Sequence, residues 1–441
     1  MRSRLATIVI AAGLLAIGAE GVGVYLYAGD LLPTSGGKAY DVLKGVPFTV
    51  SRSDKPTYPL SGTITNGTLP LADAVVSADG ISATTGADGT FSLAEVPVGP
   101  VTITRPAYMP ATYDFDGVTL TATIALQPRI VKAIRIVPDV AADDAKYQNL
   151  IDLAAATTVN TFVFDTKGDS DSAPGKHDGG LIYYDSKVPA AVSAGLVAPR
   201  FDVVKRLAEA KAAGLYTMTR IPTFLDPAYA KAHPEHVIGG DWLDPGNKEA
   251  WEYPLALGEE ACKLGFDEIQ FDYVRYPSGQ AASQARSAGK VPDAAGRTAN
   301  IKAYLTEAVK RLHPLGCAVS ADIFGIVNAI ADDQGIGQLV EEVTQPLDAY
   351  SPMIYPEQWG AGWFGLDQPS NHPGELVTAV LNKATPRVAP GVIIRPWLQS
   401  YYYSGKQILA EIASAEAQGH GWILWNSPGN YSASGLPAGA G

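Results

Sequence analysis

From Ile130 onward the chain alternates short apolar runs with amphipathic stretches, and this alternation constrains its fold more than any other feature. Strands that alternate with helical segments are typical of a parallel β/α domain, because a crossover helix joins each pair of parallel strands. Eight such runs favour a (β/α)8 barrel over a doubly wound sheet. The expected strands are Ala133–Val137, Thr161–Asp165, Leu215–Ile221, Glu268–Tyr273, Ala318–Phe324, Ala349–Ile354, Val388–Ile394 and Trp422–Trp425.

The stretches between these runs have the periodicity of amphipathic helices. No Gly-x-Gly-x-x-Gly follows the first expected strand and no phosphate-loop lysine is present, so nucleotide-binding folds lose support. The expected helices are Asp144–Ala155, Phe201–Ala213, Trp251–Leu264, Arg297–His313, Gly337–Thr344, Pro373–Asn382 and Lys406–Gln418.

Residues 57–129 have a different character, with short β-forming runs separated by turns such as Asn66-Gly67. Such spacing predicts a small antiparallel β-sandwich before the barrel. The strings Gly62–Thr65, Thr85–Leu93 and Val98–Ile103 resemble the carboxypeptidase-regulatory-like β-sandwich. This resemblance implies a non-catalytic module. The expected strands are Ser61–Thr65, Ala74–Ser77, Ile81–Thr85, Thr90–Leu93, Val101–Thr104 and Thr119–Leu126.

Residues 1–27 have the pattern of an export signal. Arg2 and Arg4 precede an apolar run from Leu5 to Gly18, as in a secretory signal peptide. The longer stretch from Leu5 to Tyr27 also has the length of an uncleaved membrane anchor. In either case we expect the protein to be extracytoplasmic, secreted or anchored, and residues 28–56 to be a linker. The barrel is expected over residues 130–435.

The composition excludes several kinds of site. A net charge of −12 argues against nucleic acid as a partner, because phosphate binding needs a basic surface. Cys262 and Cys317 are too few for a four-thiolate zinc site, and one disulfide or two buried thiols both remain open. His233 and His236 have a spacing used in some metal sites, but without a third ligand we expect no metal and no cofactor.

The segment Gly265–Pro277 has the pattern of one buried strand that carries charges. Side chains alternate faces along a strand, so Glu268, Gln270 and Asp272 share one face. A carboxylate inside a barrel is costly unless it has a partner or a chemical task. We expect Glu268 in the inner polar layer and Asp272 at the barrel mouth, with Arg275 as its partner.

The ends of the other expected strands carry further polar and aromatic residues. Active sites of (β/α)8 barrels lie at this end of the strands. Carboxylates beside aromatic rings suit a sugar-binding cleft, because pyranose faces are apolar while the hydroxyl groups need polar partners. The candidate substrate-binding residues are Asp165, Lys167, Arg220, Arg275, Tyr355, Trp359, Arg395, Trp397 and Trp425.

The expected barrel contains six ordered blocks: Phe164–Asp169, Gly265–Pro277, Ala321–Gly325, Ser351–Pro356, Arg395–Gln399 and Gly421–Asn426. Together these blocks resemble a family of glycosyl hydrolase (β/α)8 barrels of unknown function, within the glycosidase barrel group. The resemblance implies the fold and the reaction class, and it names no substrate. One departure is that Glu357-Gln358 follows Tyr355-Pro356, where the family usually has Ser-His.

Glycoside hydrolysis requires two carboxyl groups, one as acid and one as nucleophile or base. We predict Asp272 as the nucleophile or base and Asp322 as the general acid, with Glu357 as the alternative acid. Asp165 and Asp226 are further alternatives. The predicted function is hydrolysis of a glycosidic bond in an extracellular or cell-wall polysaccharide.

Two other functions stay open. The barrel could bind a cell-surface glycan without cleaving it, a role that needs aromatic side chains but no carboxylate pair. A structure in which Asp272 has no second carboxyl group within about 10 Å would favour this alternative. A metal-dependent polysaccharide deacetylase is the weaker alternative, because the six histidines are scattered along the chain.

Overall fold

The computed structural model describes most of the chain after residue 55. The chain divides into two compact units, Met1–Ser53 and Asp54–Gly441, which are described separately. The described residues are 16–18, 21–23, 56–169 and 179–439.

In the first unit, β1 (Ala16–Gly18) pairs antiparallel with β2 (Gly21–Gly23). The rest of the predicted signal or anchor, and the predicted linker up to residue 55, lie outside the described residues. Among the residues that the structure does describe, no helix has both the length and the apolar character needed to cross a bilayer.

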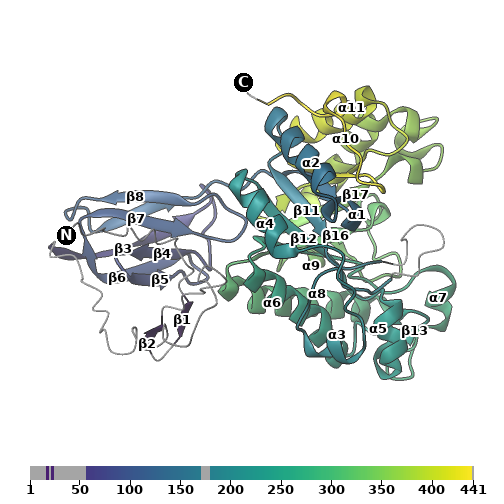
Figure 1. Cartoon of the computed structure of the whole chain (residues 1–441), viewed down its shortest axis with the longest axis horizontal. Helices are drawn as coiled ribbons and strands as arrows, with labels where there is room; N and C mark the ends of the chain where they lie inside the picture. Colours follow the sequence, from purple (N-terminus) through teal and green to yellow (C-terminus); the bar gives the residue numbers. More distant parts are fainter. Residues whose placement is uncertain (1–15, 19–20, 24–55, 170–178, 440–441) are drawn as a thin grey trace, which may run out of the picture. The chain divides into compact units, whose positions relative to one another are not determined.

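Residues 57–125 form two β-sheets around a shared apolar core that includes Leu60, Val76 and Ile103 (Figure 1). One sheet has the order β6-β3-β9 and the other β5-β4-β7-β8. The predicted sandwich missed β8 and was wrong in being wholly antiparallel, because β3 and β9 run parallel. The strands are β3 (Thr57–Thr65), β4 (Val75–Ala78), β5 (Ile81–Thr84), β6 (Thr90–Pro97), β7 (Gly99–Thr104), β8 (Ala111–Phe115) and β9 (Thr121–Ala125).

The predicted (β/α)8 barrel is confirmed. Its parallel strands follow the order β10-β11-β12-β15-β16-β17, and β20 pairs with β10 to complete the ring. Seven of the predicted strands match the observed bounds to within one residue at each end. The strands are β10 (Lys132–Ile136), β11 (Thr161–Asp165), β12 (Tyr216–Pro222), β15 (Glu268–Asp272), β16 (Ala318–Ile323), β17 (Ala349–Ile354), β18 (Ile393–Ile394), β19 (Trp397–Gln399) and β20 (Trp422–Trp425).

The seventh barrel position is the exception, because it consists of two short strands, β18 and β19. Both pair with β17, and only β19 pairs with β20. The predicted strand Val388–Ile394 began too early and ended too soon. Pro396 separates the two pieces, and its backbone nitrogen has no hydrogen to donate to a ladder.

Helices cover the outside of the ring (Figure 1). Gly265 ends α6 in the left-handed conformation, with φ of 108°, which favours glycine after a helix. The helix predicted over Gly337–Thr344 is a single turn at Val340–Val343. It does not begin at Gly337, whose φ of 80° lies outside the helical region. The helices are α1 (Pro138–Ala141), α2 (Asp144–Ala156), α3 (Pro189–Ser193), α4 (Val203–Ala212), α5 (Pro227–Ala232), α6 (Glu252–Leu264), α7 (Gly279–Gln284), α8 (Ala294–Leu312), α9 (Val340–Val343), α10 (Pro373–Ala384) and α11 (Gly405–Glu416).

A disulfide joins the two cysteines. Cys262 of α6 is bonded to Cys317, which directly precedes β16, with their Cα atoms 5.9 Å apart. Of the two alternatives that the sequence left open, the structure contains the disulfide. It links the outer helix layer to the barrel ring.

A buried ion pair between His313 and Asp348 lies where α8 leads into β16. Nε2 of His313 is 2.7 Å from Oδ2 of Asp348, which also accepts the backbone N–H of Val319 at 2.9 Å. Nδ1 of His313 is 2.9 Å from a carboxylate oxygen of Asp73. Burial lowers the pKa of His313, but the charge and hydrogen bond of Asp348, together with the hydrogen bond to Asp73, outweigh burial and raise the pKa to about 9. The protonated imidazole therefore stabilises the fold.

We expect His313→Gln to remove a pH dependence of folding. A pKa raised from 6.5 to about 9 gives stability that is complete below pH 6.5 and is lost as pH rises through 9. The free energy of unfolding of the wild type should fall by on the order of 3 kcal/mol over this window. Urea unfolding from pH 6 to 10 measures it. His372→Gln is the comparison and should remove less of the dependence, because the carboxylates paired with His372 are exposed to solvent. Parallel curves for the wild type and His313→Gln would contradict the expectation.

Candidate active site

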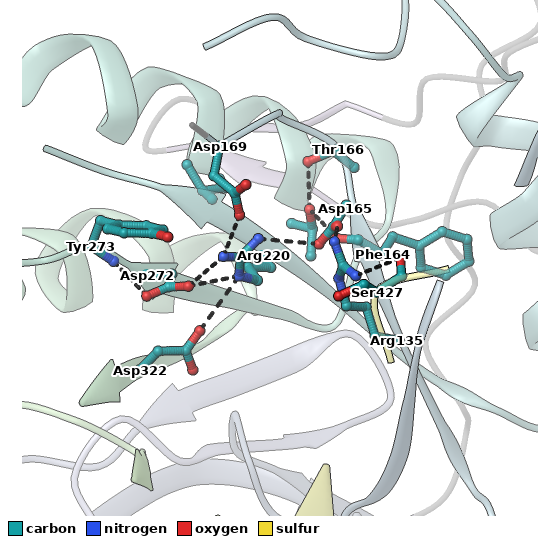
Figure 2. A network of polar contacts seen from close by, with 12 residues as sticks. Arg135, Phe164, Asp165, Thr166, Asp169, Arg220, Asp272, Tyr273, Asp322 and Ser427 are labelled. Carbon is teal, nitrogen blue, oxygen red and sulfur yellow. Dashed lines mark hydrogen bonds and ion pairs between the residues drawn. The ribbon is translucent and has the colours of Figure 1, made fainter. Parts of the chain in front are cut away.

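Arg220, on β12, is buried among four carboxylates at the barrel mouth (Figure 2). Its Nε donates to Oδ2 of Asp272 at 2.8 Å, and its Nη2 donates to Oδ2 of Asp169 at 2.7 Å. Its Nη1 is 3.5 Å from Oδ1 of Asp165, and its Nε is 3.9 Å from Oδ2 of Asp322. One guanidinium thus joins carboxylates from β11, the loop after β11, β15 and β16.

The strand register explains why these side chains meet. Arg220 is in register with Asp165 on one side and with Gln270 on the other. Asp272 lies two residues beyond Gln270, so it points to the same inner face. Parallel barrel strands end on one rim, and residues at their ends converge there.

Asp272 ends β15 and is held from two sides. Its Oδ1 accepts the backbone N–H of Tyr273 at 2.6 Å, and its Oδ2 is 2.5 Å from Nη2 of Arg220. Tyr273 has φ of 49°, which ends the strand directly after the carboxylate. Burial raises the pKa of Asp272 above its usual range, and the charge of Arg220 and the two hydrogen bonds only partly oppose this rise. The ionised form therefore has strong partners despite its burial.

Asp322, on β16, lies in a less polar environment. Nε1 of Trp397 donates to its Oδ1 at 2.6 Å, while its Oδ2 has no hydrogen bond from the described residues. Burial raises the pKa of Asp322 well above its usual range, and the negative charge of Asp272 raises it further. The pKa of Asp322 is thus raised further than that of Asp272, so Asp322 is the carboxyl group of the pair that keeps its proton to higher pH.

A second cation, Arg135 of β10, supports the same cluster. Its Nη2 forms an ion pair with Oδ2 of Asp165. The guanidinium groups of Arg135 and Arg220 lie 3.9 and 4.9 Å from the ring centroid of Trp425, in cation–π geometry. These contacts hold the indole of Trp425 at the wall of the site.

A cavity of about 1160 Å³ opens over this cluster. It exceeds the pockets of typical small-molecule sites, about 300–1,000 Å³, so it has room for several sugar units. The lining residues include Arg135, Asp139, Asp165, Asp169, Tyr183, Arg200, Arg220, Asp272, Tyr273, Arg275, Asp322, Phe324, Tyr355, Gln358, Tyr401 and Trp425.

A separate polar layer lies deeper in the barrel, and it includes one predicted substrate-binding residue. Glu268 accepts a hydrogen bond from Ser320 at 2.5 Å and forms an ion pair with Arg395. Tyr216 donates to its other oxygen at 3.2 Å. The predicted inner position of Glu268 is confirmed. Arg395 is 1% exposed and does not line the cavity, so its predicted contact with substrate loses support.

Lys167 also lies away from the cavity. Its Nζ is 2.7 Å from Oδ2 of Asp226 and donates to the carbonyl oxygen of Pro222 at 2.6 Å. Both side chains are buried, and neither lines the cavity. Lys167 and Asp226 therefore pair with each other away from the cavity. This position removes support for Lys167 as a substrate ligand and for Asp226 as an acid.

The remaining predicted residues divide between the cavity and the core. Arg275 lines the cavity and stacks on Trp242 at 4.5 Å, while the guanidinium that pairs with Asp272 is that of Arg220. Trp359 is buried against Trp363, with ring centroids 5.1 Å apart. Glu357 is exposed, and neither it nor Trp359 lines the cavity. This placement weakens Glu357 as the alternative acid.

Several cavity residues were not selected from the sequence, among them Arg135, Asp169 and Tyr401. Arg135 could have been found by the signal used for Asp272, a charge in an otherwise apolar strand. Asp169 lies in the block Phe164–Asp169 and was passed over for Asp165. Tyr401 carries no comparable signal.

One group of potential metal ligands lies outside the cavity. Glu235 joins His233 and His236, with the three ligand atoms within 4.8 Å of one another. Glu235 is therefore a potential third ligand that the sequence analysis did not recognise. All three side chains are at least partly exposed, and no chemistry of the barrel mouth depends on them.

A family model described as "Putative glycosyl hydrolase domain" matches residues 133–431. The chain belongs to this family. The match spans the barrel from β10 to β20 and includes Arg220 and the four carboxylates around it. No sequence among the curated proteins matches the chain.

Several solved structures are similar to the glycosyl hydrolase domain. A hypothetical protein from Ruminiclostridium thermocellum ATCC 27405 is 29% identical over 43% of this chain and 96% of its own, with a TM-score of 0.36. The PgaB (BpsB) glycoside hydrolase domain from Bordetella bronchiseptica is 15% identical over 68% and 94%, with a TM-score of 0.47. A chitinase from Chromobacterium violaceum ATCC 12472 is 11% identical over 69% and 96%, with a TM-score of 0.41. At these TM-scores the similarities do not bear on the chemistry of the site.

Proposed function

We propose that the barrel hydrolyses a glycosidic bond in an extracellular or cell-wall polysaccharide. The observation that carries the proposal is the pair Asp272 and Asp322, which face one cavity and share Arg220 as a neighbour. Two carboxyl groups in different protonation states are what this reaction needs. The family match supports the reaction class.

Asp272 acts as the nucleophile and Asp322 as the acid. Asp322 donates its proton to the glycosidic oxygen as Asp272 bonds to the anomeric carbon and the leaving sugar departs. The Asp322 carboxylate then takes a proton from water, whose oxygen displaces Asp272 from the anomeric carbon. The sugar is released with its original anomeric configuration, and both carboxyl groups return to their starting states.

The spacing of the pair supports this retaining course. Oδ2 of Asp272 and Oδ2 of Asp322 lie 2.8 and 3.9 Å from the same Nε of Arg220. Their separation cannot exceed the sum of these distances, which is below most of the range of inverting pairs, about 6.5–9.5 Å. Non-catalytic glycan binding is less well supported, because Asp272 does have a second carboxyl group within about 10 Å.

The proposed location is extracytoplasmic, in keeping with the Cys262–Cys317 disulfide. In this proposal residues 1–27 direct export or anchor the protein, and residues 28–56 form a linker. Residues 57–129 are a non-catalytic module of the carboxypeptidase-regulatory-like type, and residues 130–435 are the catalytic barrel.

A screen of purified protein against cell-wall and exopolysaccharide fractions tests the proposal. We expect new reducing ends from at least one fraction and none with Asp272→Asn. Proton NMR of the first product should show a retained anomeric configuration. Binding to a fraction without release of reducing ends would instead favour the glycan-binding alternative.

A further inference from the structure

Tyr402 follows the cavity residue Tyr401 and combines two unfavourable features. Its side chain is 89% exposed, and its φ is 60°, a left-handed conformation that residues other than glycine rarely adopt. An exposed aromatic side chain alone is common on protein surfaces. Strained backbone persists where surrounding structure enforces it, and such strain concentrates at ligand sites.

The backbone on both sides of Tyr402 is fixed by hydrogen bonds. Nε2 of buried Gln399 donates to the carbonyl oxygen of Tyr401 at 3.1 Å. The hydroxyl of Tyr403 donates to the carbonyl oxygen of Ser370 at 2.9 Å. These bonds hold the turn that presents the Tyr402 ring to solvent.

The exposed ring is the outer end of a series of aromatic contacts. The centroid of Tyr402 is 5.2 Å from that of Tyr401, which lines the cavity. Tyr401 is 6.2 Å from Tyr355, and Tyr355 is 6.3 Å from Trp425. The series thus runs from solvent to the wall of the carboxylate cluster.

The inner end of the series lies on the side of Asp322. Trp425 contacts Trp397 at 5.5 Å, and Trp397 donates its hydrogen bond to Asp322. Beside burial, the charge of Asp322 raises the pKa of Tyr355 more than the charge of Asp272 does. The acid protonates the leaving oxygen, so sugars of the leaving group lie on this side.

We propose that Tyr401 and Tyr402 form an outer subsite for pyranose units on the leaving-group side of the cleaved bond. The subsite rests on the proposed function and extends it, because it requires a chain of several sugars and cleavage at internal bonds. Its ligands are pyranoses with equatorial hydroxyl groups, whose flat apolar faces can stack on the Tyr402 ring while their edges meet Tyr401.

The test uses the full chain with Asp272→Asn, in which bound sugar is not cleaved. The probes are dimers and hexamers of β-1,4-linked N-acetylglucosamine and of β-1,4-linked glucose. Adding Tyr402→Asn should weaken hexamer binding about tenfold, or about 1.4 kcal/mol, without changing dimer binding. Tyr402→Phe, which keeps the ring, should bind like the parent. Asparagine tolerates the left-handed conformation, so the unfolding temperature of Tyr402→Asn should not fall.

The outcomes separate the subsite from the proposed function. Equal hexamer affinity with and without the Tyr402 ring, or no hexamer binding by the parent, would overturn the subsite. Tyr402-dependent hexamer binding by a wild type that cleaves no fraction would support the subsite and refute the hydrolase. Cleavage of a fraction by the wild type, with hexamer affinity independent of Tyr402, would support the hydrolase and refute the subsite.

Discussion

Asp272→Asn is expected to lower kcat by at least about 10⁴-fold, since loss of a catalytic nucleophile typically costs this much or more. The amide cannot form the glycosyl ester, although it can keep the hydrogen bond from Tyr273. Reducing-end release and the thermal unfolding temperature measure activity and folding. Asp185→Asn, an exposed carboxylate outside the cavity, is the matched control and should retain wild-type activity. An active Asp272→Asn protein would refute the assignment.

Asp322→Asn separates the acid from the nucleophile. Loss of the general acid should lower kcat by about 10²–10⁴-fold. The loss should be smaller for substrates whose leaving group departs without being protonated. Because Asp322 must be protonated, activity of the wild type should fall as pH rises through its raised pKa. The variant should lose this alkaline limb while keeping the acid limb, where Asp272 becomes protonated. An unchanged pH profile in Asp322→Asn would move the acid to another residue.

Arg220→Met is expected to destabilise the barrel by about 3–5 kcal/mol, as removal of one partner from a buried ion pair does. Asp165, Asp169 and Asp272 would all lose a close cation while staying buried. The charge of Arg220 lowers the pKa of Asp272, so this pKa would rise in the variant and protonation of Asp272 would relieve part of the cost. The deficit should therefore be smallest at low pH and grow as pH rises. Urea unfolding at several pH values measures this dependence.

Two further variants check the cause. Arg200→Met breaks an ion pair with Asp139 at the cavity rim, where both side chains are partly exposed, and should cost less than about 1 kcal/mol. Arg220→Met combined with Asp272→Asn should cost less than the sum of the single changes, because one unpaired charge is removed. If the loss of unfolding free energy were independent of pH and the two changes were fully additive, Arg220 would contribute packing alone.

The segment Gly265–Pro277 shows what local pattern can predict. Its alternation placed Glu268 and Asp272 on one inner face at different depths, and both positions are observed. The prediction succeeded because side-chain direction along a strand depends only on the period of the backbone. The partner assigned to Asp272 was Arg275, three residues away, and here the local argument was insufficient. The observed partner, Arg220, comes from the neighbouring strand.

The other cations show the same limit. Lys167 and Arg395 lie just beyond the ends of predicted strands, and Arg220 lies near the end of its own. All three were assigned to the substrate. Lys167 pairs with Asp226 and Arg395 with Glu268, both in buried positions outside the cavity. Nothing in the sequence near these residues distinguishes them from Arg220, because each partner lies on a different part of the chain.

The sequence by itself determined the barrel, the strands that build it and the end at which its carboxylates gather. Backbone periodicity and the common direction of parallel strands are sufficient for these features. Only the tertiary structure decided which charges meet, how deep each lies and which aromatic rings reach the cavity. Those features depend on the register between neighbouring strands and on single backbone conformations such as that of Tyr402. Strand register joins residues that are distant in the chain, and contacts with distant residues set such backbone conformations.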